Sequence, residues 1–131
     1  MNITMDFETY SECDIFKAGA YAYADHNTTE VLCLAWALGD ATPTLWTPDM
    51  PPPQKLFELI EQGATVWAWN SFFEMSIWNQ TLGWPSIPIA QWRDSAALAA
   101  AQAYPRALGK CGEALGLSGD EVKSKRGKLL I

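Results

Sequence analysis

The sequence has few of the features that mark secreted, membrane or disulfide-stabilised proteins. Its three cysteines are an odd number without CxxC spacing, so neither a disulfide framework nor a structural zinc site is indicated. No apolar run reaches the roughly 18 residues of a membrane span, and the opening MNITMDFETY carries acids where a signal peptide would carry bases. We therefore expect a soluble, cytoplasmic protein in which Cys13, Cys33 and Cys111 act as small buried hydrophobes.

Glycine-rich phosphate-binding motifs are also missing. Neither GxGxxG nor GxxxxGK[ST] occurs, which disfavours a doubly wound nucleotide-binding fold. The single histidine, His26, lies in a polar loop, where we expect a structural or solvent-exposed role.

The length and composition predict one folded domain, residues 1–131. The chain is 49% hydrophobic and 18% charged and contains seven tryptophans, which excludes disorder for most of its length. Because most tryptophans lie in apolar segments, we expect core packing for them; these are residues 36, 46, 67, 78, 84 and 92.

Basic side chains are scarce, which at first argues against a nucleic-acid ligand. The formal net charge is −6, but the charge is unevenly distributed. Residues 1–92 carry 11 acidic and 2 basic side chains, whereas residues 93–131 carry 4 acidic and 7 basic ones. An acidic part joined to a basic part is compatible with a carboxylate metal site beside a phosphate-contacting strip.

Hydrophobic periodicity predicts alternating strands and helices. Apolar and polar residues alternate over residues 2–9, as in a half-buried strand, and the run 29–38 is typical of a central strand. A turn at Gly39-Asp40 and a short strand over 42–47 follow. Further strands are predicted over 64–69 and 89–93, and helices over 54–63, from 71, over 96–103 and over 107–117. This order predicts an α/β fold with a mixed sheet.

Two segments carry the candidate chemistry. Asp6 and Glu8 lie two apart on the first strand, so both carboxylates point to one face and offer hard oxygen ligands to Mg²⁺ or Mn²⁺. A solvated polar strand face is the alternative for an isolated DxE. A third acid, Glu74, lies four residues after Asn70, where a buried strand gives way to a helix. Asn70 itself is also a helix N-cap candidate.

These segments resemble the DEDD family of 3′–5′ exonucleases, the DnaQ-like branch of the ribonuclease H-like fold. The matching residues are DFET at 6–9 and NSFFE at 70–74. The similarity continues through TEVLCLAWAL, ATVWAWN, WRDSAALAAA and ALGKCGEALGL, in the order seen in phage-type family A DNA polymerases. The chain is thus similar to the N-terminal proofreading module of such a polymerase, with a three-layer ribonuclease H-like fold.

The resemblance implies a two-metal mechanism. Asp6, Glu8 and Glu74 would hold two Mg²⁺ or Mn²⁺ ions that activate water and stabilise the leaving 3′-oxygen. Glutamate at 74 replaces the more usual aspartate of the second motif. Asp94 stands where relatives have an Asp-Thr pair; an N-cap role explains it, and it is the substitute ligand if Glu74 fails.

The resemblance also implies contacts with the 3′ end of single-stranded or frayed DNA. Thr9 would bond the terminal nucleotide and Trp69 would stack on a base, although packing roles are the alternative for both. The remaining candidates for nucleic-acid contacts are Asn70, Phe73, Arg106 and Lys110. The charged run from about residue 119, with Lys123, Lys125, Arg126 and Lys128, is expected to be a mobile tail or a phosphate site.

The third motif of the family, a tyrosine or histidine followed by a final aspartate, is expected beyond Ile131. The fold is therefore expected to be C-terminally incomplete, with a polymerase domain or another chain supplying the missing residues. Our leading hypothesis is a metal-dependent proofreading exonuclease domain that hydrolyses terminal phosphodiester bonds of DNA. The alternatives are a catalytically incomplete nucleic-acid-binding or structural module of the same fold, and an enzyme completed by domain swapping.

Overall fold

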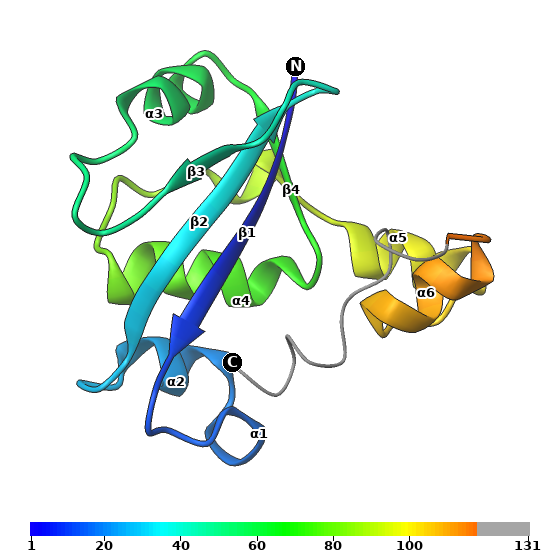
Figure 1. Cartoon of the computed structure of the whole chain (residues 1–131), viewed down its shortest axis with the longest axis horizontal. Helices are drawn as coiled ribbons and strands as arrows, with labels where there is room; N and C mark the ends of the chain where they lie inside the picture. Colours follow the sequence, from blue (N-terminus) through cyan, green and yellow to red (C-terminus); the bar gives the residue numbers. More distant parts are fainter. Residues whose placement is uncertain (118–131) are drawn as a thin grey trace.

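A mixed five-stranded sheet forms the centre of the computed structural model, which describes residues 1–117 (Figure 1). The strand order is β3-β2-β1-β4-β5; β2 runs antiparallel to both β1 and β3, whereas β4 runs parallel to β1 and β5 runs parallel to β4. The strands are β1 (Asn2–Tyr10), β2 (Glu30–Leu38), β3 (Thr44–Trp46), β4 (Thr65–Ala68) and β5 (Trp92–Asp94). The predicted α/β fold with a mixed sheet is confirmed, and it is consistent with a ribonuclease H-like fold.

The helices over the later part of the chain lie where the sequence predicts them, and two short helices precede them near the N-terminus. They are α1 (Ile15–Ala18), α2 (Ala20–Asp25), α3 (Gln54–Glu61), α4 (Ser71–Ser76), α5 (Ser95–Ala101) and α6 (Leu108–Ala114). A π-helical turn, η1 (Ile77–Thr81), continues α4. The predicted basic run from residue 119 lies outside the described residues.

One predicted strand begins later than expected. Residues Ile89–Gln91 form a 3₁₀ turn, η2, and only Trp92–Asp94 pair with β4. The Gln91 side chain donates hydrogen bonds to the carbonyls of Ile60 and Ala64 at 3.0 and 2.9 Å. These bonds tie η2 to the end of α3, so the first half of the apolar run cannot join the sheet ladder.

Alternation along β1 decides which face of the sheet is buried. Ile3, Met5 and Phe7 are buried, whereas Thr4 and Asp6 are exposed on the other face. The buried face packs against the α2 and α4–η1 layer, which lies behind β1 and β2 in the view of Figure 1. The acids of the first strand are therefore outside the core, as the period-two pattern predicts.

A cluster of aromatic side chains forms part of the core. Trp84 is its centre, because its ring centroid lies 4.8 Å from that of Trp78, 4.9 Å from Trp46 and 5.2 Å from Phe57. All three contacts are edge-to-face, the geometry that aromatic quadrupoles favour. The prediction that most tryptophans pack in the core is confirmed for Trp36, Trp46, Trp78 and Trp92, which are buried.

The pairing of β1 with β2 contains a β-bulge next to the two acids. Glu8 pairs with Cys33 and Thr9 pairs with Val31, which leaves Leu32 as the extra residue. Leu32 is 47% exposed, whereas Leu34, two residues later, is fully buried. The bulge therefore lets Val31 and Leu34 both enter the core although they are three residues apart.

His26 and Cys111 have the structural roles predicted for them, whereas Cys13 and Cys33 are less buried than expected. His26 Nδ1 accepts a hydrogen bond from the Thr28 backbone at 3.1 Å and shapes the loop after α2. The three cysteines are free thiols; Cys111 is buried and the other two are half-buried. Within residues 1–117, no helix has the length and apolarity required to cross a membrane.

We predict that two leucines of β2 differ sharply in their contribution to stability. Leu34→Ala should lower the free energy of unfolding by about 2–5 kcal/mol, because it leaves a cavity in the core. Leu32→Ala, in the bulge and half-exposed, should lower it by less than about 1 kcal/mol. Urea titrations followed by tryptophan fluorescence measure both values, and equal losses would contradict the assigned bulge.

Candidate functional site

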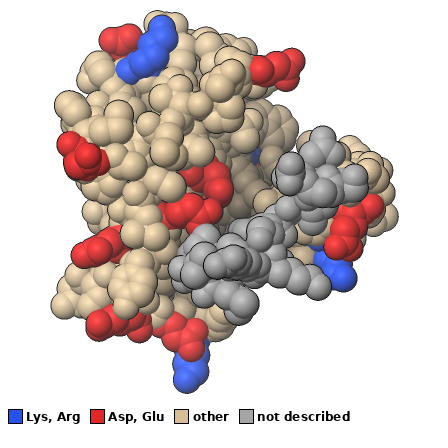
Figure 2. All heavy atoms as spheres, in the orientation of Figure 1, with Lys and Arg blue, Asp and Glu red and all other residues tan. Residues whose placement is uncertain are grey.

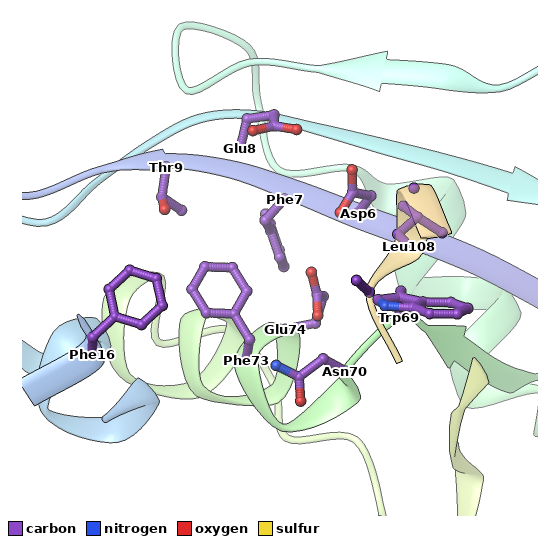
Figure 3. Close-up of a pocket in the computed structure, with 12 residues that line it drawn as sticks. Asp6, Phe7, Glu8, Thr9, Phe16, Trp69, Asn70, Phe73, Glu74 and Leu108 are labelled. Atoms are coloured by element: carbon purple, nitrogen blue, oxygen red, sulfur yellow. The ribbon is translucent and has the colours of Figure 1, made fainter. Parts of the chain in front are cut away.

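A cavity of about 570 Å³ opens where β1 passes the start of α4 (Figure 3). Its lining includes predicted site residues from three elements: Asp6, Glu8 and Thr9 of β1, Trp69 and Asn70 after β4, and Phe73 and Glu74 of α4. Phe16 of α1 and residues 107–109 at the start of α6 complete the wall. The parallel pairing of β1 with β4 brings these segments together, because the residues that follow β4 reach the same end of the sheet.

Asp6 and Glu8 share one face of β1 and create a negative potential there. Asp6 is exposed and Glu8 is half-buried, and Glu8 lies opposite Cys33 on β2. Burial raises the pKa of the Cys33 thiol, and the charges of Glu8 and Asp6 raise it further. Figure 2 shows acidic side chains gathered near the middle of this face, over β1.

Glu74 faces the core from α4, although it is an acid. It is only 2% exposed and shares the buried side of the helix with Ile77 and Trp78. Figure 3 shows its carboxyl group pointing up towards β1. Among the described residues its Oε2 atom is buried without any hydrogen-bond partner. A buried polar atom left unpaired is costly, so this position is not explained by packing.

The environment of Glu74 favours its protonated form. Burial is the main cause and the negative charge of Asp6 the second; together they raise the pKa of the Glu74 carboxyl from 4.5 to about 8. A hydrogen bond from the backbone of Phe7 offsets part of the shift. A proton on Glu74 or a positive charge nearby would relieve its repulsion with Asp6.

The carboxylates offer a partial fit to a divalent cation. Glu74 supplies a buried oxygen without a partner, and Asp6 lines the same cavity. As the side chains lie, however, no group of three or more His, Cys, Asp or Glu residues within residues 1–117 is arranged to hold a metal ion. Asp6, Glu8 and Glu74 line one cavity and are the residues that could hold an ion there.

The turn from β4 into α4 departs from the predicted capping arrangement. Asn70 occupies the N-cap position, but its side chain makes no capping hydrogen bond, and its backbone is left-handed at φ 65°. Asparagine tolerates this conformation better than most residues. The cap comes from Asp94 instead, whose carboxylate accepts hydrogen bonds from the backbones of Asn70 at 3.1 Å and Ser71 at 3.2 Å.

Asp94 also caps α5, as predicted. Its Oδ1 accepts from the backbones of Ala96 and Ala97 at 2.9 and 3.2 Å. One carboxylate therefore holds the first turns of two helices, which explains its presence without a metal. The sequence predicted the α5 cap. It did not predict the hydrogen bonds to the start of α4, because Asp94 lies about two dozen residues farther along the chain.

Thr9 and Trp69 are both engaged in contacts within the chain. The Thr9 hydroxyl lies 2.8 Å from the Tyr23 hydroxyl and the residue is 5% exposed. Trp69 is half-buried, and its indole N–H donates to the Arg106 carbonyl at 2.9 Å. Both residues nevertheless line the cavity, so they also shape its walls.

The predicted basic contacts do not line the cavity but flank, in the sequence, a segment that does. Arg106 precedes α6 and Lys110 lies within it, and both are exposed. The segment between them, residues 107–109, lines the cavity. Phe16 was missed by the sequence prediction; the available signal was an aromatic residue within a polar segment.

Comparison with known proteins identifies one relative. No protein-family model matches the chain. The chain is 33% identical over 132 residues to the DNA polymerase of Bacillus phage SP02, a match that covers 98% of this chain and 20% of that polymerase. The chain therefore spans about a fifth of the relative's length and is similar to one region of it.

We predict that Glu74 makes stability depend on pH. Between about pH 4.5 and 8 the folded chain retains a proton that the unfolded chain has lost, so stability falls as the pH rises through this window. The fall should be a few kcal/mol, since one pKa unit corresponds to about 1.4 kcal/mol. Denaturant titrations with a chelator present, at pH 5, 6.5 and 8, measure it.

Two variants provide the comparison for this prediction. Glu74→Gln cannot titrate and should remove the fall, whereas Glu58→Gln, at an exposed position on α3, should retain it. An unchanged pH dependence in Glu74→Gln would show that the raised pKa is incorrect.

We also predict that Asp94 is a major stabilising residue. Asp94→Ala leaves two helix starts uncapped and should lower the free energy of unfolding by about 2–4 kcal/mol. Asp14→Ala removes a cap from α1 alone, where Asp14 accepts one hydrogen bond from Phe16, and should cost about 0.5–1 kcal/mol. Equal losses in urea titrations would contradict the double-cap role.

Proposed function

We propose that this chain is the 3′–5′ exonuclease part of a DNA polymerase and hydrolyses the terminal phosphodiester bond of single-stranded or frayed DNA. The observation that carries the proposal is the buried Glu74 carboxyl, whose Oε2 has no partner among the described residues and which lines one cavity with Asp6 and Glu8. The likeness to a phage DNA polymerase over the length of the chain supports the polymerase context of this proposal.

The acids are suited to work with divalent cations. Asp6 and Glu74, with Glu8 beside them, would hold Mg²⁺ or Mn²⁺ by their carboxylate oxygens, the ligands that these ions prefer. When bound, such ions supply activation of water and stabilisation of the charge on the leaving oxygen. Without them the acids repel a phosphodiester, so we expect both binding and hydrolysis to require the metal.

The remaining residues of the cavity position the strand. Trp69, fixed by its bond to the Arg106 carbonyl, presents a flat surface beside the acids, and Phe73 lies on the other side. Aromatic side chains bind unpaired bases irrespective of sequence, which suits the removal of any terminal nucleotide. Arg106 and Lys110 add positive charge next to the cavity, where they would contact phosphates.

A second candidate function is a nucleic-acid-binding or structural module without turnover. The observation that favours it is that, as the side chains lie in residues 1–117, no three acids are arranged as a metal site. It predicts weak metal binding and DNA binding without release of nucleotides. The two proposals therefore differ in one measurable outcome, the release of nucleotides from DNA.

The test is release of nucleotides from a 5′-labelled single-stranded oligonucleotide. With Mn²⁺ or Mg²⁺ the chain should shorten the labelled strand stepwise from its 3′ end, and a chelator should stop the reaction. Asp6→Asn and Glu74→Gln should each lower the rate by about 100-fold or more, because each removes several kcal/mol of transition-state stabilisation. Glu58→Gln on α3, remote from the cavity, serves as the control.

The outcomes separate the two proposals. Metal-dependent shortening that both acid substitutions abolish supports the exonuclease. DNA binding without shortening supports the binding module, and full activity in both acid variants would exclude the exonuclease assignment.

A further inference from the structure

Phe16 is the most exposed large hydrophobic side chain of residues 1–117. It is 98% exposed, whereas Ile15 beside it is half-buried and packs against the core. Phenylalanine belongs to the residue types that are most often buried, and burying its ring is worth about 1.5–3 kcal/mol. The helix α1 is thus anchored through Ile15. Because the Phe16 ring is exposed, packing within the described residues does not explain a phenylalanine at this position.

The backbone of Phe16 is nevertheless held by hydrogen bonds within α1. The Asp14 carboxylate accepts a hydrogen bond from the Phe16 backbone at 3.0 Å, and the Gly19 backbone donates to the Ile15 carbonyl at 2.8 Å. α1 also packs against α2. The ring is therefore presented from a short capped helix.

This ring lies on the wall of the cavity that holds the acids. Figure 3 shows Phe16 and Phe73 on one side of Glu74 and Trp69 on the other. A strand with its phosphodiester at the acids would have room for bases on both sides. In this view Phe16 lies farther from Glu74 than Phe73 does.

The charge next to Phe16 fits the same ligand. Lys17 is one of two basic side chains among residues 1–92, in a region that carries 11 acids. A flat apolar ring followed by a cation matches a nucleotide, which has a flat base and an anionic phosphate. An apolar protein partner would not require that cation.

We propose that Phe16 is a stacking platform for an unpaired nucleobase of the strand that enters this cavity. The inference rests on the proposed function and extends it, because it names a base-binding surface on the α1 side of the cavity. A base within a duplex already has both faces stacked. Only a single-stranded or frayed end can place a base on Phe16, so the platform selects unpaired ends.

The test uses oligothymidylate carrying the fluorescent base 2-aminopurine near its 3′ end. Binding to the chain should quench the fluorescence, as stacking on a ring does, and Phe16→Ala should remove much of the quenching. Phe16→Ala should also raise KM for the oligomer about 5- to 150-fold with little change in kcat, since base–aromatic stacking is worth about 1–3 kcal/mol. Phe16→Trp should restore both properties.

Two controls separate this inference from the proposed function. Phe72→Ala removes another exposed phenylalanine, on α4 and outside the cavity lining, and should behave as the unaltered chain. The p-nitrophenyl ester of thymidine 5′-monophosphate tests hydrolysis with a single nucleoside and should be cleaved equally by Phe16→Ala.

The possible results are distinct. If the chain shortens DNA but Phe16→Ala keeps the unaltered KM and quenching, the stacking platform is wrong and the exonuclease stands. If DNA binds with Phe16-dependent quenching but is not shortened, the exonuclease is wrong and the platform stands. Absence of DNA binding, or quenching lost equally in Phe72→Ala, overturns the platform.

Discussion

The carboxylate of Asp94 is the interaction on which the arrangement of the cavity depends. It accepts four backbone hydrogen bonds, two from the start of α4 and two from the start of α5. Hydrogen bonds to a charged acceptor are stronger than neutral ones, and helix N-termini carry partial positive charge. The ends of β4 and β5 are thereby held side by side, and α4 begins at one defined point beneath β1.

The starting point of α4 decides which of its residues face β1. From Ser71 the helical period turns Glu74, Ile77 and Trp78 towards the core. Two of these positions hold apolar residues and stabilise the packing. The third holds an acid whose protonated form the fold favours, since burial and Asp6 raise its pKa to about 8. The buried acid lowers the stability of the core, and this acid lies in the wall of the cavity.

Much of the fold was predictable because local pattern and global fold agree. Period-two alternation in β1, the apolar run of β2 and the proline-led entry of α3 each specify their element without help from distant residues. The exceptions have distant causes. The Gln91 side chain bonds the end of α3 and holds Ile89–Gln91 out of the sheet, and the bulge at Leu32 depends on pairing between β1 and β2. Neither cause leaves a local signal.

The candidate site shows the same division. The sequence by itself determined which residue types were available: two acids on one strand face, a third acid four residues after an asparagine, and an acidic part joined to a basic one. Only the tertiary structure decided that Glu74 is buried with a partnerless oxygen, that Asp94 rather than Asn70 caps α4, and that Phe16 stands at the cavity wall. The physical reason is that periodicity sets the direction of a side chain relative to its own element, whereas burial and hydrogen-bond partners depend on elements far away in the chain.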